Sequence, residues 1–302
     1  MNIAYRFRIY PTEEQKILLG KTFGCCRFLY NQMLNDKIRE YEKTKKMLKN
    51  TPAMYKKEYP FLKEVDSLAL ANVQLHLEKA YKNFFRDPKI GFPRFKSKHH
   101  SKNSYTTNVV NGNILVESKR IRLPKLKWIA MKKHREPAEG LRLKSVTVSM
   151  EPSGKYFASL LYEGYSCENQ AAGPDYSTAK ILGIDYAMQG MAVFSEKVET
   201  EEAGFFRKNE KRLAREQRKL SRCVRGSHNY ELQKKKVARC HEKIRNQRRD
   251  HLHKLSRKIA DGYDAVAVED IDMKAMGQCL HFGKSVQDNG YGMFREMLDY
   301  KL

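Results

Sequence analysis

Two acidic residues each follow a short apolar segment of this 302-residue chain: Asp185 comes after residues 181–184, and Glu269 comes after residues 265–268. A buried strand that carries a carboxylate at its end is one way to place a metal ligand, and Mg²⁺ prefers oxygen ligands. Metal ions held in this way stabilise the attacking and leaving oxygens of phosphodiester cleavage. The alternative is that each strand ends in a solvated acid, and the residues alone leave the two interpretations even.

A second feature is a cationic stretch, residues 205–258, which contains twenty Lys and Arg against five Asp and Glu, a net charge of about +15. Many of these cations stand three or four residues apart, where like charges destabilise a helix. A phosphate backbone would relieve that repulsion and release counterions. The alternative is a solvated pair of charged helices. The residues expected to contact nucleic acid are Arg207, Arg212, Arg215, Arg218, Arg222, Lys235, Arg245, Arg248 and Arg249.

Aromatic and cationic residues alternate in a third segment, residues 91–98. The cations Arg94, Lys96 and Lys98 would meet phosphates while Phe92 and Phe95 stack on bases. The alternative is that both phenylalanines plug a hydrophobic core and the cations face solvent. Composition alone does not separate these two interpretations.

The composition of the whole chain narrows the class of partner. A formal net charge of +24 favours a polyanion, and 41% hydrophobic residues are enough for a core. No apolar run is long enough to span a bilayer, so we expect nucleic acid and no membrane. The six cysteines form no Cys-x-x-Cys pair, which predicts no zinc site and reduced thiols in a cytoplasmic protein. Adjacent Cys25 and Cys26 are expected to be half-buried helix residues.

The elements that position these residues follow from periodicity. We expect a strand at residues 4–10, a helix at 13–41 that begins with the Thr12/Gln15 capping box, and a helix at 67–85. Short strands at 113–116, 120–123, 143–150 and 156–162 predict a small antiparallel β-barrel that the first strand joins. After a linker come strands at 181–185 and 191–194, one or two helices within 205–258, a buried strand at 265–268 and a helix at 289–302.

Several segments together resemble the TnpB proteins of insertion sequences, the OrfB-type transposases related to type V CRISPR nucleases. The opening residues 5–15, the helix segment 26–31 and the segment 91–98 look like that family. Residues 183–185 are similar to its first RuvC motif and residues 268–271 to its second, while residues 217–222 and 246–250 look like its basic helices. The resemblance covers essentially the whole chain in the right order.

The resemblance implies an α+β fold. A β-barrel wedge domain would comprise residues 1–10 and 87–166, and residues 11–86 would form a helical recognition insertion. A linker at 167–180 would lead to an incomplete RNase H-like (RuvC) domain at 181–302. Members of the family are RNA-guided, Mg²⁺-dependent DNA endonucleases, so a guide RNA and a double-stranded DNA target are the implied partners. By this resemblance Asp185 and Glu269 would be the catalytic, metal-binding acids.

This sequence departs from the family pattern in two places. The family's third carboxylate follows a four-cysteine zinc ribbon, and neither lies in these 302 residues; Asp288 and Asp299 do not match that acid. Ala187 also stands where many members have glycine. We therefore expect a shortened nuclease domain with impaired DNA cleavage. The alternative is a nuclease-inactive, RNA-guided DNA-binding regulator, and a weaker one is a general RNA-binding protein.

Overall fold

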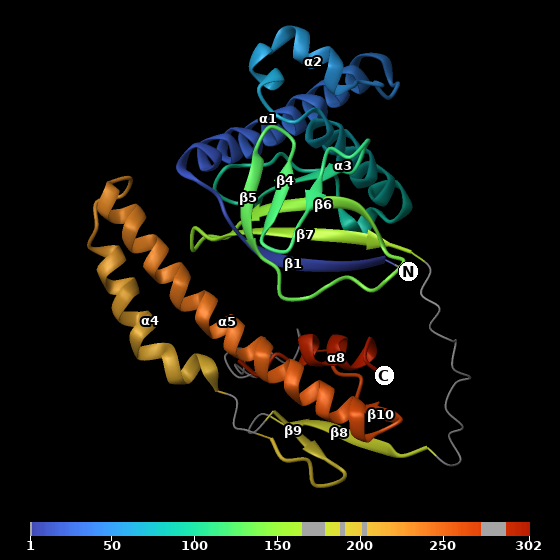
Figure 1. Ribbon diagram of the computed structural model, residues 1–302, viewed down its shortest axis with the longest axis vertical. Coiled ribbons are helices and arrows are strands. Elements are labelled where there is room, and N and C mark those ends of the chain that lie inside the picture. Colours follow the sequence, from blue (N-terminus) through green and yellow to red (C-terminus); the bar gives the residue numbers. More distant parts are fainter. Residues whose placement is uncertain (1, 165–178, 188–190, 201–203, 273–287) are drawn as a thin grey trace. The chain divides into compact units, whose positions relative to one another are not determined.

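The computed structural model describes residues 2–164, 179–187, 191–200, 204–272 and 288–302 (Figure 1). The chain divides into two compact units, Met1–Cys167 and Glu168–Leu302. Most of the predicted linker 167–180, together with Cys167 and Cys279, lies outside the described residues. Within the described ranges, no helix is long and apolar enough to cross a membrane.

The first unit is built on an antiparallel sheet of seven strands in the order β2-β6-β7-β1-β5-β4-β3. The first strand pairs with β7 along its length and with β5 at its end, so the prediction that it joins the sheet is confirmed. The strands are β1 (Asn2–Tyr10), β2 (Asn103–Asn108), β3 (Leu115–Val116), β4 (Arg120–Leu123), β5 (Lys127–Lys132), β6 (Arg142–Met150) and β7 (Tyr156–Glu163).

The predicted β-barrel is not confirmed, because no closed barrel is found among the described strands. The end strands β2 and β3 of the sheet do not pair with each other within the described part of the chain. Alternating residues establish which face of a strand is buried, but they do not determine whether a sheet closes on itself. Here β2 is an edge strand, and α1 and α3 pack against it. Covering an edge strand with helices is one way to keep it from pairing with another chain.

The helices of the first unit begin at local capping signals. The predicted box at the start of α1 (Glu13–Thr44) is present, since the Thr12 N–H donates to Gln15 Oε1 at 3.0 Å and the Gln15 N–H donates to Thr12 Oγ1 at 3.4 Å. At the start of α3 (Ser67–Arg86), the Asp66 carboxylate accepts from the Leu68 N–H at 3.0 Å. Shorter helices are α2 (Pro52–Glu58), η1 (Pro60–Lys63) and η2 (Pro88–Ile90).

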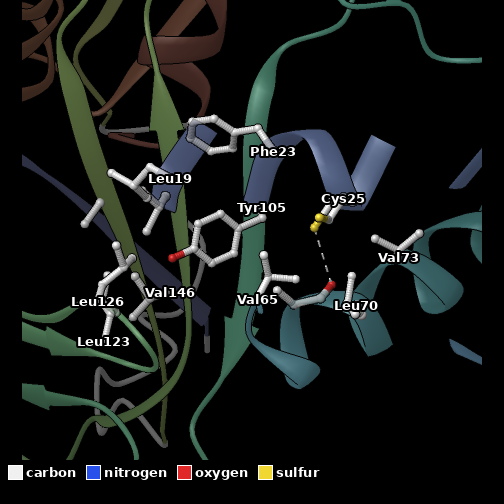
Figure 2. Close-up of a cluster of buried hydrophobic side chains, with 14 of the residues drawn as sticks. Leu19, Phe23, Cys25, Val65, Leu70, Val73, Tyr105, Leu123, Leu126 and Val146 are labelled. Atoms are coloured by element: carbon white, nitrogen blue, oxygen red, sulfur yellow. Dashed lines mark hydrogen bonds between the residues drawn. The ribbon is translucent and has the colours of Figure 1, made fainter. Parts of the chain in front are cut away.

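The core of the first unit lies between these helices and the sheet (Figure 2). Phe23 of α1 and Tyr105 of β2 pack with ring centroids 6.0 Å apart. Cys25 and Cys26 are both buried, more completely than predicted, because α1 contacts α3 as well as β2. The Cys26 thiol points to the backbone oxygen of Ala69 on α3, 4.0 Å away.

The second unit has a three-stranded sheet in the order β10-β8-β9 among its described residues, with β10 parallel and β9 antiparallel to β8. The edge strand β10 is half-buried rather than buried as predicted. Two basic helices form in the predicted region, separated by a turn in which Gly226 has φ +84°. The elements are β8 (Ile181–Ala187), β9 (Met191–Phe194), α4 (Phe205–Ser221), α5 (His228–Gly262), β10 (Ala265–Val268) and α8 (Tyr291–Asp299).

Candidate metal centre and nucleic-acid interface

The structure brings the two sequence-predicted acids together. Strands β8 and β10 are parallel with Ile184 opposite Val268, so Asp185 and Glu269 occupy the next position on neighbouring strands. Both residues are exposed, and both line one shallow hollow that also includes Ser195 after β9. Two carboxylates from distant parts of the chain therefore face the same patch of solvent.

Close backbone contacts hold the strand that carries Asp185. The Gly183 N–H donates to Ser195 Oγ at 2.9 Å, and the Ser195 N–H donates to the Gly183 oxygen at 3.0 Å. A Cβ atom on Gly183 would lie 3.3 Å from the Ser195 Cβ, which is a tight contact. Glycine at this position therefore lets the segment after β9 approach the strand beside Asp185.

The end of β8 is also tied to α8. The Tyr291 hydroxyl donates to the backbone oxygen of Ala187, two residues beyond Asp185, and receives a hydrogen bond from Asn289 Nδ2 at 2.9 Å. The Tyr291 ring packs 4.7 Å from that of Tyr186, and burial raises the pKa of both hydroxyls. Both tyrosines therefore stay neutral near the acids: Tyr291 packs and forms hydrogen bonds, whereas Tyr186 acts through packing.

The donor set at the hollow fits a hydrated, oxygen-preferring ion. Carboxylate oxygens are suitable ligands for Mg²⁺, which keeps several of its waters when few protein ligands are present. The neighbouring acid Asp270 is engaged elsewhere, because Arg295 Nη1 lies 2.9 Å from its Oδ1. Among the described residues, there is no group of three or more His, Cys, Asp or Glu side chains that could hold a metal ion. The hollow thus offers two acids.

Most of the cations predicted to contact nucleic acid are exposed on α4 and α5, which pack against each other. Arg215 lies 3.6 Å from Glu216 of its own helix, and Arg249 Nε lies 3.3 Å from His253 Nε2. The exposed members of the predicted set are Arg207, Arg212, Arg215, Arg218, Arg222, Lys235, Arg245 and Arg249.

Arg248 lies in a different environment from the other predicted cations. Its side chain is 19% exposed and its Nη2 lies 3.2 Å from Oδ1 of Asp288, which is 3% exposed. The same carboxylate accepts from the Phe206 N–H at 2.9 Å and so caps α4, which has no side-chain cap of its own. Sequence reasoning missed this role of Asp288, because its partners lie 40 and 82 residues away and leave no local signal.

In the segment 91–98, Arg94, Lys96 and Lys98 are all exposed, and Lys96 is also held in place by neighbouring residues. Its ammonium lies 3.9 Å from the centroid of the Tyr30 ring, and the Asn31 side chain bonds its backbone N–H at 2.8 Å and its oxygen at 2.9 Å. Desolvation lowers the pKa of Lys96.

The two phenylalanines of this segment behave differently. Phe92 packs edge-on to Tyr81 and Phe84 of α3, with centroids 5.5 and 5.4 Å apart. It is therefore partly packed, against a helix rather than in a barrel. Phe95 is 56% exposed, so its ring is open to a stacking partner.

Two family profiles match the chain. One, described as a "Probable transposase" of the OrfB proteins of IS605, matches residues 164–279. The other, described as the helix-turn-helix domain of the same proteins, matches residues 1–46.

Two curated relatives are similar along almost the whole chain. A protein of Streptomyces pristinaespiralis, provisionally named an RNA-guided DNA endonuclease, is 32% identical over 99% of this chain and 74% of its own length. The InsQ protein of Escherichia coli K12, which carries the same provisional name, is 30% identical over 99% of this chain and 77% of its own length. The cryo-EM structure of a Cas12f1–sgRNA–target DNA complex aligns at 14% identity with a TM-score of 0.30, over 100% of this chain and 82% of that one. That score is too low to establish a shared fold.

Proposed function

The chain belongs to the OrfB family of IS605-type transposases, and from that premise we propose that it is an RNA-guided DNA-binding protein with a nuclease site at Asp185 and Glu269. It holds a guide RNA and uses it to recognise a double-stranded DNA target. The names of the two curated relatives support this proposal, as does the surplus of exposed cations on α4 and α5. The ion at the site is Mg²⁺.

The observation that carries the nuclease part is the register of β8 and β10, which places Asp185 beside Glu269 at the edge of one hollow. Bound Mg²⁺ supplies charge stabilisation for phosphodiester cleavage. The two carboxylates hold and orient the ion, and Gly183 with Ser195 keeps the Asp185 strand in position.

We extend the proposal to the architecture. The open sheet of the first unit corresponds to a wedge domain, and α1 to α3 correspond to the helical recognition insertion. The second unit corresponds to the RuvC-type, RNase H-like nuclease domain. The parallel pair β8 and β10, each followed by an acid, supports that assignment.

The number of acids favours slow cleavage. Among the described residues, two carboxylates line the hollow, and Asp270 is paired with Arg295. Many nucleases use a pair of metal ions, and two carboxylates leave most of the coordination of such a pair to water and the substrate phosphate, so we propose that these 302 residues cleave DNA slowly or not at all by themselves. The same observation favours a second candidate function, a nuclease-inactive, RNA-guided DNA-binding regulator.

The test is to purify the chain with its RNA, sequence that RNA, and measure binding and Mg²⁺-dependent cleavage of a DNA that matches it. We expect RNA-dependent DNA binding with little cleavage. Asp185→Asn and Glu269→Gln should abolish any residual cleavage and leave DNA binding unchanged, because both acids line the hollow and neither belongs to the cationic helices. Glu296→Gln, which alters an exposed acid of α8 in the same unit, is the matched control and should leave cleavage unchanged.

Each outcome separates the candidates. Rapid cleavage that Asp185→Asn removes would establish the endonuclease and contradict the expectation of slow cleavage. Binding without cleavage in every variant would favour the regulator. DNA binding that does not depend on RNA would contradict both.

A further inference from the structure

A pocket of about 310 Å³ lies within the first unit, among α1, α3, β2 and the segment that follows residue 91. It is large enough for a small ligand of nucleotide size. Four of its lining residues are basic: Arg27 of α1, His76 of α3, and Lys96 and Lys102 of the connecting segment. We call it the basic pocket.

The basic pocket concentrates positive charge without a counter-charge. No Asp or Glu is among the described residues that line it. Cys26 also lines it, but burial raises the pKa of that thiol to about 12, so it is neutral at physiological pH. Grouped cations without acids repel one another, and a bound anion would relieve that repulsion.

The surroundings of Lys96 and His76 also favour a bound anion. Desolvation lowers the pKa of Lys96, and desolvation together with the charges of Lys96 and Lys79 lowers the pKa of His76. Positive charge in the pocket is therefore disfavoured in the free protein. The bonds between the Asn31 side chain and the Lys96 backbone fix the part of the chain that carries this lysine beside the pocket.

Neutral hydrogen-bonding groups line the rest of the pocket. Ser101, Ser104 and Thr106 supply hydroxyls, and Asn72 supplies an amide. The Thr106 hydroxyl is bonded to Thr147 at 2.8 Å on the neighbouring strand, which leaves lone pairs able to accept. Cations for a phosphate beside hydroxyls for a sugar match the two halves of a ribonucleotide backbone unit, whose 2′-hydroxyl both donates and accepts.

We propose that the basic pocket binds one nucleotide of a single-stranded RNA segment, with Arg27, Lys96 and Lys102 on its phosphate and the hydroxyl side chains on its ribose. The proposal deepens the proposed function, and it rests on that function for the identity of the RNA as a guide. It gives the first unit a nucleic-acid contact of its own, separate from the cationic surface of α4 and α5.

The test uses the full chain and two probes, an oligouridine and the matching oligodeoxyuridine, which differ only in the 2′-hydroxyl. Affinity is measured by fluorescence anisotropy across a range of salt concentrations. Arg27→Gln, Lys96→Gln and Lys102→Gln should each weaken oligouridine binding about tenfold and reduce the slope of log K against log salt by about one. Lys82→Gln removes an exposed charge of α3 outside the pocket and should leave the affinity nearly unchanged.

The ribose contact has its own variant. Ser104→Ala should reduce the preference for oligouridine over oligodeoxyuridine and leave the salt slope unchanged, because it removes no charge. The melting temperature of each variant without nucleic acid serves as the folding check, and exposed Lys102 is the substitution least able to disturb the core.

The outcomes distinguish this inference from the proposed function. Unchanged oligouridine affinity and slope in all three cation variants, while a guide RNA still co-purifies, would overturn the inference alone. Equal affinity for the two oligonucleotides would overturn the assignment to RNA, and stabilisation by inorganic phosphate without any oligonucleotide binding would replace RNA with a free phosphate. Absence of a co-purified guide with the predicted pocket effects intact would count against the proposed function only.

Discussion

Asp288 shows how one buried carboxylate links separate parts of the second unit. It accepts from the Phe206 N–H at the start of α4 and pairs with Arg248 of α5, while Asn289 and Tyr291 next to it reach the end of β8. A buried ion pair adds little net stability compared with apolar packing, but removing one partner leaves a charge without its counter-charge. Asp288 is therefore sensitive to substitution although it lies outside the hollow.

We expect Asp288→Ala to destabilise the second unit by roughly 3 kcal/mol, because it removes a helix cap and the partner of Arg248 together. Asp288→Asn should cost less, since an amide oxygen still caps a helix. The measurement is hydrogen–deuterium exchange of α4 by mass spectrometry. Asp299→Ala, an exposed acid of α8, is the control. Equal exchange rates in the Ala variant and the unmodified chain would contradict the assigned role.

At the scale of the element, the α4–α5 pair is held together by few apolar contacts. Leu213 and Ile244 are buried, and Gln233 Nε2 donates to the Glu216 carboxylate at 2.8 Å, which lowers the pKa of Glu216. The cations face outward. Arg212, Arg218 and Lys235 form no ion pair with the described residues. These three cations therefore lower the stability of the helices, but they would strengthen nucleic-acid binding.

The triple variant Arg212→Gln, Arg218→Gln and Lys235→Gln should reduce the salt slope of RNA binding by about three, because each cation neutralises one phosphate. Its melting temperature without RNA should stay the same or rise, since like charges are removed and Gln favours helix. Binding is followed by anisotropy and melting by circular dichroism. An unchanged slope would show that these cations face solvent only.

The single variant Arg257→Gln is the control for that experiment. Its guanidinium pairs with Asp261 at 3.0 Å in the same helix. Losing this exposed pair should cost about 0.3–0.5 kcal/mol of helix stability and leave the salt slope nearly unchanged. The two variants thus differ in the sign of the stability effect as well as in binding.

At the scale of the whole molecule, the described residues form two hydrophobic cores. One includes Leu19, Leu70 and Val146 of the first unit, and the other includes Leu252 and Phe294 of the second. Each core contains residues of one unit only. We therefore expect local destabilisation to stay within a unit.

Leu252→Ala should destabilise the second unit by about 2–5 kcal/mol, the usual cost of a cavity at a fully buried leucine, and leave hydrogen exchange in the first unit unchanged. Leu70→Ala, equally buried in the first unit, is the reciprocal control with the opposite pattern. Exchange that increases in both units of either variant would contradict independent cores.

Much of the local structure followed from sequence alone, because its causes act over a few residues. The Thr12/Gln15 box specified the start of α1, and the apolar runs before Asp185 and Glu269 indicated β8 and β10. Cations at helical spacing indicated α4 and α5. The strands β2 and β5 were missed, since the polar run at 103–108 and the short segment at 127–132 become strands only through their pairing with β6, β1 and β4.

The sequence by itself determined which residues carry charge, where the longer helices form and which acids follow apolar runs. Only the tertiary structure decided that the sheet of the first unit is open, that Asp185 and Glu269 are neighbours, that Arg248 pairs with Asp288 and that Lys96 lines a pocket. The physical reason is the separation along the chain between the residues that interact. Capping and periodicity depend on neighbours along the chain, whereas register, sheet closure and buried ion pairs depend on contacts between residues far apart in sequence.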